Sequence, residues 1–502
     1  MSFGPPPSVF TQSALAADQA TRKRRRTRLL GVLAVLVVLG LGAGGLLLSS
    51  AGDDSAHADG KGAATAAQSP DAIRETVEKV PSSPEGRLAL EHDEEHVSQY
   101  TETNPRYAPG TWATGKILAR GVANHIVGIR IKPPYDETAW TLKLDGHICA
   151  TSRHVTADGR TAVVIQPPHA KGSKQEGVCD QVVFVDLNTG KKLWQKKMPS
   201  PQQAYVTNTN LTLTKGVVAV AWGHGSVAYD MKDGRQLWDS ATVSRCEDKG
   251  FAGGRALLAL VSCGEGTAAT YEVQKLDPRT GKPRWTYKVA SGVQAVYLPS
   301  SDPPVLAVAA GDNEATDLIS LDARGRRRAT ISLSGYDAKC GARYFFSPYF
   351  GVLENCDGLV VGRTQAYVMS KENIANNQPS DWIVAFDLKT GRSQGKFDGR
   401  DLQMIYPLRM SGDELLIYRR GADVNAPAAV VSWNARTDKE TPLLFFQLPE
   451  DDDAELSDPE QTDIVFEKGR VFFGKRELVR DDKYPKDPVL MAIGIGSAGL
   501  KH

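Results

Sequence analysis

The stretch that decides the fold is Val183-Phe184-Val185-Asp186-Leu187-Asn188-Thr189-Gly190-Lys191-Lys192-Leu193-Trp194. The same order of alternating apolar residues, Asp, Gly and Trp returns in residues 227–238, and again in residues 273–285. Weaker copies lie near residues 321–325, 386–391 and 433–437. A repeat of about 40–50 residues that is built on strands is typical of a β-propeller.

Each copy reads as a strand, a tight turn and a return strand. Alternating Val residues predict a half-buried strand, and an Asp side chain begins a turn by accepting backbone N–H groups. Gly supplies the positive φ that closes the hairpin, and Trp on the return strand fills the wedge between neighbouring sheets. The predicted turn residues are Asp186, Gly190, Asp230, Gly234, Asp277, Gly281, Asp387 and Gly391. The predicted blade-packing residues are Trp140, Trp194, Trp238 and Trp285.

The Asp-x-x-Thr-Gly-x-x-x-Trp pattern resembles the pyrroloquinoline-quinone-like (PQQ-like) repeat, over roughly residues 110–498. That repeat builds quinoprotein dehydrogenases and also BamB-like outer-membrane assembly proteins. The resemblance implies an all-β fold, a PQQ-like β-propeller of four-stranded blades. Eight blades are favoured, and seven remain possible if the short first unit near Lys116 is not a blade. Since the motif residues fold the blade, they say little about chemistry.

The N-terminal segment predicts a membrane anchor. Residues 1–28 form a basic tail whose composition predicts disorder, and residues 29–48 carry no charge. Twenty helical residues span about 30 Å, the thickness of the hydrocarbon core. The basic block at residues 22–28 places the N-terminus in the cytoplasm and the propeller outside. The predicted localisation is therefore the cell membrane, with a single pass; cleavage after residues 49–51 as a signal peptide is the alternative.

Residues 49–109 are predicted to be an extracytoplasmic linker with short helices at residues 71–79 and 88–100, followed by the propeller at residues 110–498. A propeller must close, because an open ring leaves strand edges exposed. The chain ends without a last outer strand. Thr111 and Trp112 are predicted to supply it, which would make Trp112 structural.

Six cysteines follow the predicted membrane segment, in an oxidising compartment. Their number allows many pairings, but the repeat places two in each of three blades. The predicted disulfides are Cys149–Cys179, Cys246–Cys263 and Cys340–Cys356. Each would close a loop and add roughly 3 kcal/mol of stability in the chain-entropy model.

The sequence carries no catalytic motif, so no catalytic, cofactor-binding or metal residue is predicted. A quinoprotein dehydrogenase, which the repeat resembles, implies PQQ stacked over a Trp, adjacent cysteines in a disulfide, calcium and an Asp base. Adjacent cysteines are absent, and Trp222 is the candidate for a channel Trp. Calcium is a second alternative, at the acidic residues 450–455 with Asp458 and Glu460.

The balance of 60 basic and 59 acidic residues argues against a nucleic-acid partner. The predicted function is a non-catalytic, membrane-anchored binding scaffold or sensor. Its propeller face would bind a protein or cell-envelope ligand, with the polar insertion at residues 371–379 as a candidate surface. The alternative is an exported PQQ-dependent oxidoreductase.

Overall fold

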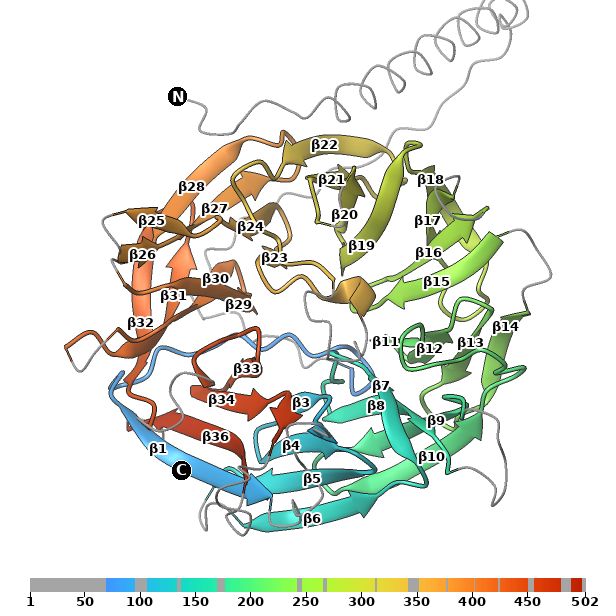
Figure 1. The fold of residues 1–502 in the computed structure, drawn as a ribbon, viewed down its shortest axis with the longest axis horizontal. Helices are drawn as coiled ribbons and strands as arrows, with labels where there is room; N and C mark the ends of the chain where they lie inside the picture. The colour runs from blue at the N-terminus through green and yellow to red at the C-terminus, as the bar shows by residue number, and fades with distance from the viewer. Residues whose placement is uncertain are drawn as a thin grey trace, which may run out of the picture.

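The computed structural model describes residues 69–94, 106–132, 137–168, 177–241, 246–264, 269–311, 314–341, 352–375, 378–400, 402–422, 425–449, 456–479 and 489–498. Eight four-stranded antiparallel sheets are arranged around a central axis, as blades of a propeller (Figure 1). The predicted all-β propeller is therefore confirmed, with eight blades.

The blades are numbered I–VIII along the chain, and their strands are given from the axis outward. Blade I is formed by β3 (Thr111–Ala113), β4 (Ile117–Val122), β5 (His125–Arg130) and β6 (Thr138–Lys143), and blade II by β7 (His147–Thr151), β8 (Arg160–Gln166), β9 (Gln181–Asp186) and β10 (Lys191–Lys197). Blade III is formed by β11 (Asn210–Thr214), β12 (Val217–Ala221), β13 (Gly225–Asp230) and β14 (Gln236–Ala241), and blade IV by β15 (Cys246–Ala252), β16 (Leu257–Cys263), β17 (Thr270–Leu276) and β18 (Pro283–Lys288).

Blade V is formed by β19 (Val293–Ser301), β20 (Pro304–Ala310), β21 (Asp317–Leu321) and β22 (Arg327–Ser332), and blade VI by β23 (Leu359–Val361), β24 (Gln365–Met369), β27 (Trp382–Asp387) and β28 (Ser393–Asp398). Blade VII is formed by β29 (Ile405–Ser411), β30 (Glu414–Arg419), β31 (Ala428–Asn434) and β32 (Lys439–Phe446), and blade VIII by β33 (Thr462–Glu467), β34 (Arg470–Lys475), β36 (Val489–Ser497) and β1 (Gly86–Glu94). The smaller elements are β2 (Arg106–Tyr107), which pairs with β35 (Glu477–Leu478), β25 (Asn373–Ala375), which pairs with β26 (Gln378–Ser380), and the 3-10 turn η2 (Val352–Glu354).

Neighbouring blades are joined through the repeated Trp and Gly. The ring of Trp194 on β10 lies against Gly234 of blade III, where a Cβ atom would come within 2.7 Å of the ring. Its Nε1 donates to the carbonyl of Met231 in the same turn, at 3.0 Å. Trp140, Trp238 and Trp285 lie in the same way against Gly190, Gly281 and Gly325. Each Gly combines a positive φ with this close approach, which is why the turn requires Gly.

The core is distributed between the blades, because each sheet buries both of its faces. Between blades II and III, Phe184 stacks on Trp194 with ring centroids 5.3 Å apart, and Trp194 packs against Tyr229. Trp222 belongs to this same buried cluster and does not line a channel. Trp112, which was predicted to close the ring, lies in the core between blades I and II, where its Nε1 donates to the Ser152 carbonyl at 2.8 Å.

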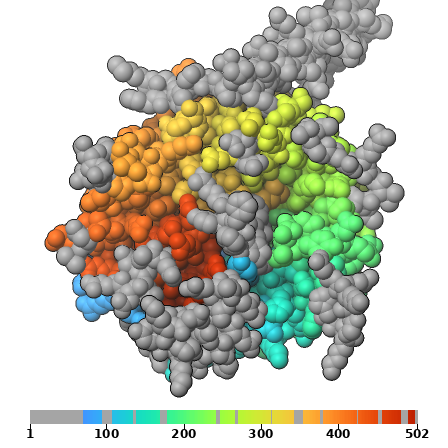
Figure 2. Space-filling model, in the orientation of Figure 1, coloured from blue at the N-terminus to red at the C-terminus, as the bar shows by residue number. Residues whose placement is uncertain are grey.

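The ring closes differently from the prediction. Thr111–Ala113 is the innermost strand of blade I, and β1 is the outermost strand of blade VIII, paired with β36. Figure 2 shows the blue of β1 beside the red of the last strands. Residues 86–94 are thus strand rather than helix, and the propeller begins before residue 110. Tertiary pairing overrides the helix propensity of this segment, because blade VIII has only three other strands.

The residues before β1 cross the middle of the ring (Figure 1) and are called the strap here (residues 69–85). They are not helical at residues 71–79, because their backbone groups bond to turns of the blades: Arg74 N–H donates to Val155, and Ala157 N–H to Ala72. The Arg409 guanidinium of β29 donates to the Thr76 carbonyl and pairs with Glu78. The strap is therefore a part of the folded propeller.

The three predicted disulfides, Cys149–Cys179, Cys246–Cys263 and Cys340–Cys356, are confirmed. The first joins β7 to the segment just before β9, the second joins β15 to β16, and the third closes the connection that carries η2. In the described part of the chain, no helix has the length and apolar character needed to cross a membrane. The predicted span at residues 29–48 lies outside the described residues.

Ring closure by β1 gives a paired test on one strand. Leu90 is 2% exposed and packs in the core between blades VIII and I, whereas Leu88 is 54% exposed. We expect Leu90→Ala to lower the free energy of unfolding by about 2–5 kcal/mol, because it leaves a cavity. Leu88→Ala should change it by less than about 0.5 kcal/mol. Urea unfolding of both variants measures this, and equal effects would show that β1 is not part of the folded ring.

The strap gives a second test. Arg409 faces Glu78 and Glu467, whose side chains are almost fully buried. Arg409→Met leaves Glu78 without this cation and Glu467 with Arg74 alone, and should cost about 3–5 kcal/mol of unfolding free energy. Arg255 also holds the strap, through Glu75, but this pair is more exposed. Arg255→Met should therefore cost about 1 kcal/mol or less. If Arg409→Met is no worse than Arg255→Met in urea unfolding, the strap is not anchored as described.

Candidate functional site

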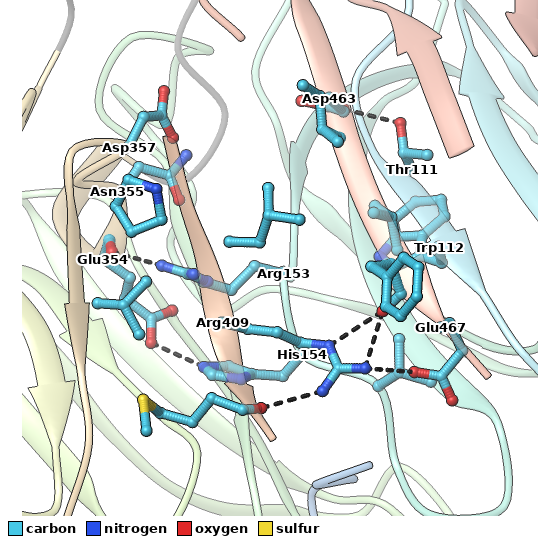
Figure 3. A pocket seen from close by; sticks show the side chains of 18 of the residues that line it. Thr111, Trp112, Arg153, His154, Glu354, Asn355, Asp357, Arg409, Asp463 and Glu467 are labelled. Atoms are coloured by element: carbon cyan, nitrogen blue, oxygen red, sulfur yellow. Dashed lines mark hydrogen bonds and ion pairs between the residues drawn. The ribbon is translucent and has the colours of Figure 1, made fainter. Parts of the chain in front are cut away.

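The centre of the ring holds a polar cavity of about 870 Å³, bordered by the innermost strands and by the strap (Figure 3). Its size is within the range of small-molecule sites. The side chains that point into it come from separate blades, because each innermost strand presents only a few residues to the axis. Charged groups of both signs line it, and their pairing decides what the cavity can bind.

One side of the cavity carries a buried carboxylate. Glu354, at the end of η2, accepts from the backbone N–H of Gly253 at 2.8 Å and contacts His154 Nε2 at 2.9 Å. Burial alone would raise the pKa of Glu354, but His154, Arg153 and the Gly253 N–H outweigh it and hold this pKa below its usual value. Arg153 Nη1 donates to the Glu354 carbonyl at 2.7 Å, which turns its guanidinium into the cavity.

The opposite side is built around Asp463 on β33. Asp463 accepts from Thr111 at 2.8 Å and from Arg476 at 2.7 Å, and it faces the fully buried Arg120 at 3.7 Å. Burial would raise the pKa of Asp463, but Arg476 and Arg120 lower it below its usual value. Burial lowers the pKa of Arg120 to about 10, so this side chain remains a cation at neutral pH. This cluster joins blade VIII to blade I.

The charges of the cavity therefore serve mainly to hold the ring together. Glu467 accepts from Thr76 of the strap at 2.8 Å and faces Arg74 and Arg409. These groups are paired with one another, so none of them is poised as a general base or nucleophile. Arg153 differs, since its described hydrogen bond is to a neutral carbonyl and its side chain is exposed in the cavity.

A second region of interest lies at one edge of blade VI, in the connection between β24 and β27. The insertion at residues 371–379 is a β-hairpin, formed by β25 and β26, and not an open polar loop. Leu402 N–H donates to the Pro379 carbonyl at 3.0 Å, so the connection to blade VII runs beside this hairpin. The side chain of Ile374 on β25 is 66% exposed and that of Leu402 is 46% exposed.

Asp381 lies at the base of the same hairpin and is 1% exposed. Its Oδ1 accepts from Ile405 N–H at 3.0 Å, and its Oδ2 has no hydrogen-bond partner. Burial raises the pKa of Asp381 to about 7, with Glu372 adding to the rise, while the Ile405 N–H and Lys339 oppose it. Neither this buried acid nor the Glu354–His154 pair could be predicted from the sequence, because neither belongs to the repeat.

The predicted turn residues are all used structurally. Asp186, Asp230, Asp277 and Asp387 each accept the N–H of the residue two positions on, and Asn434 takes the same role in blade VII. The structure thus brings none of these carboxylates into the cavity. The acidic residues 450–455 lie outside the described residues. Asp458 accepts from Glu460 N–H within a turn, and Glu460 pairs with Lys339.

The residues of the cavity do not fit pyrroloquinoline quinone. Among the described residues that line it, Trp112 is the only Trp, and its ring is 2% exposed and covered by Gly110. It offers no free face for stacking. All six cysteines form disulfides between residues far apart in the sequence. In the described part of the chain, no three His, Cys, Asp or Glu side chains gather as a metal site.

Similar folds occur among solved structures. BamB from Moraxella catarrhalis is 12% identical, with a TM-score of 0.42, and the match covers 77% of this chain and 96% of that chain. The quinohemoprotein alcohol dehydrogenase of Pseudomonas putida HK5 is 12% identical, with a TM-score of 0.47 and coverages of 85% and 78%. A europium-containing methanol dehydrogenase is 12% identical, with a TM-score of 0.45 and coverages of 84% and 95%. These likenesses concern the fold alone.

A search of curated protein sequences gave no match. The family model described as "Outer membrane protein assembly factor BamB" matches residues 129–250 and residues 223–398. The two matches together span residues 129–398, which is more than half of the chain. The chain therefore belongs to the family of the outer membrane protein assembly factor BamB.

Proposed function

We propose that this protein is a non-catalytic binding scaffold, anchored in the cell membrane by residues 29–48, and that a partner protein docks on the edge of blade VI. The family supports this proposal, since its model is described as an assembly factor. The central cavity supports it as well, because its paired charges favour architecture over catalysis and its residues do not fit a quinone.

The observation that carries the proposal is the exposed pair Ile374 and Leu402. A single exposed apolar side chain is common on a protein surface, but these two are brought to one edge by their shared contacts with Pro379. The pair lies on a hairpin that projects from the regular four-stranded blade. An apolar edge of this kind fits a partner protein that presents a complementary apolar segment.

The backbone at Leu402 adds to the argument. Leu402 has a φ of 64°, in the left-handed region that non-glycine residues seldom adopt. The N–H bond to Pro379 holds it there, and Gln403 N–H donates to the Arg400 carbonyl next to it. Residues held in this region of φ concentrate at functional sites, because a strain of about 1–3 kcal/mol persists only where the surroundings enforce it.

Site-specific photo-crosslinking in the intact membrane protein tests this edge. A photoreactive residue at Leu402 should form one predominant adduct, and Ile374→Asp should reduce that adduct at least about tenfold, because a buried charge disfavours an apolar contact. Leu193 on β10 is the control, since it is similarly exposed on another blade. The same probe there should give no such adduct. An identical adduct at both positions, or one unaffected by Ile374→Asp, would contradict the proposal.

Asp381 makes this edge sensitive to pH. Its folded-state pKa, about 7, is above the value near 3.9 of an unfolded Asp, so ionisation opposes folding. Stability is therefore lost as the pH rises from about 4 to about 7, by up to ~4 kcal/mol. Asp381→Asn keeps the acceptor for Ile405 N–H and removes the charge. We expect its unfolding free energy, relative to the wild type, to increase across this range.

Urea unfolding at several pH values measures the effect. Asp398→Asn is the control, because Asp398 lies on the same blade with a well-exposed side chain. Its difference from the wild type should stay constant between pH 4 and pH 7. A constant difference for Asp381→Asn as well would show that Asp381 is ionised in the folded protein throughout this range.

A further inference from the structure

Two polar side chains of the central cavity carry hydrogen-bond donors that no described residue uses. Arg153 Nη1 donates to the Glu354 carbonyl, and the other nitrogen atoms of this guanidinium have no partner among the described residues. Asn355 follows Glu354 in the chain and lines the same cavity, and its side-chain amide likewise has no described partner. Because Arg153 bonds to the carbonyl that immediately precedes Asn355, the two residues lie beside one another (Figure 3).

The other arginines that line the cavity are each paired with a carboxylate. Arg74 and Arg409 face Glu467, Arg476 faces Asp463 and Asp357, and Arg255 and Arg363 share Glu75. In the part of the chain that the structure describes, Arg153 has no carboxylate at ion-pair distance. Among the carboxylates of the cavity, Asp413 alone has no described cation partner. It lies in the β29–β30 turn of blade VII, which blades I and VIII separate from blade II and Arg153.

The backbone is fixed on both sides of Arg153. Ser152, which precedes it, is fully buried, and its carbonyl accepts from Trp112 Nε1 at 2.8 Å. His154, which follows it, contacts the Glu354 carboxylate at 2.9 Å. The guanidinium is therefore presented to the cavity from a rigid segment, while most of its donors are unused.

Asn355 is fixed in the same manner. Glu354, before it, also accepts from the Gly253 N–H at 2.8 Å, and Cys356, after it, forms the disulfide with Cys340. Two donors held in place before a ligand arrives reduce the entropy that binding would otherwise lose. Such preorganised groups are typical of a binding site.

Apolar side chains border the same cavity. Leu408 and Met410 on β29 and Ile464 on β33 are half-buried there. Small-molecule sites combine apolar walls with a few polar groups that fix the orientation of the ligand. A ligand that suits this cavity therefore has an apolar body and one group that accepts hydrogen bonds from Arg153 and Asn355.

The chemistry of these donors favours a carboxylate. The planar guanidinium can donate two parallel N–H bonds to the two oxygens of a carboxylate. The single negative charge of a carboxylate also matches the single Arg that has no carboxylate partner. A phosphate group carries a charge of about −1.5 to −2, and it would call for further unpaired cations.

We propose that the central cavity binds a small organic monocarboxylate. Arg153 and Asn355 hold its carboxylate, and its apolar body lies against the half-buried side chains of β29 and β33. This site goes beyond the proposed docking of a partner at blade VI and does not depend on it.

Isothermal titration calorimetry of the full chain in lipid nanodiscs tests the site with benzoate, an apolar ring that carries one carboxylate. Benzamide is the matched neutral probe, and empty nanodiscs provide the blank. Benzoate should bind saturably to one site per chain. It should bind at least about tenfold more tightly than benzamide, because a charged acceptor strengthens the hydrogen bonds from a guanidinium.

Three variants locate the binding. Arg153→Met should weaken benzoate binding at least about tenfold and leave benzamide binding nearly unchanged. Arg153→Lys keeps a cation that can donate to the Glu354 carbonyl but lacks the planar fork, so it should still weaken benzoate binding about three- to tenfold. Arg363→Met is the matched control, because Arg363 lines the same cavity and shares Glu75 with Arg255. It should change benzoate binding less than about twofold.

The melting temperature of each variant shows whether it is folded, and Arg153→Lys keeps the test decisive if Arg153→Met is not. Equal affinities for benzoate and benzamide, the absence of saturable benzoate binding, or equal losses in Arg153→Met and Arg363→Met would overturn the proposal. Inorganic phosphate that binds at Arg153 more tightly than benzoate would overturn it in favour of a phosphorylated ligand. None of these outcomes changes the crosslink expected at Leu402, so the two sites are tested separately.

Discussion

The structure depends on one constraint, which is that a four-stranded blade must bury both of its faces. The repeat meets it locally, because each Trp on an outer strand packs against the Gly turn of the next blade, as Trp194 does against Gly234. Only a closed ring meets it everywhere, since the first and last blades otherwise expose a face and an edge. β1, which precedes the repeats in the chain, closes the ring by pairing with β36 near its end.

The strap follows from this closure. A chain that must reach the outer edge of blade VIII from the region of blades II and III has to cross the ring, and it does so over the turns of the blades. This path brings Glu78 and Thr76 over the axis, where Glu78 pairs with Arg409 and Thr76 donates a hydrogen bond to Glu467. Many of the charged side chains in the central cavity are therefore paired with groups of the strap.

The repeat predicted the blade number, the three disulfides and the turns, because these depend on local patterns that recur. It could not reveal β1, since Glu91 and His92 obscure a strand whose only apolar signal is Leu88 and Leu90. The Glu354–His154 pair joins residues two hundred positions apart, and the burial of Asp381 depends on a hairpin that the repeat lacks. Such sites arise from contacts between blades, which a single sequence does not encode as a pattern.

The two faces of the propeller differ for a physical reason. On one face the connections are short hairpins, in which the Asp and Gly positions are fixed by backbone geometry. The connections on the other face vary in length, and one of them carries the hairpin with Ile374. This asymmetry explains why the repeat, which encodes the short hairpins, does not predict the features that differ from blade to blade.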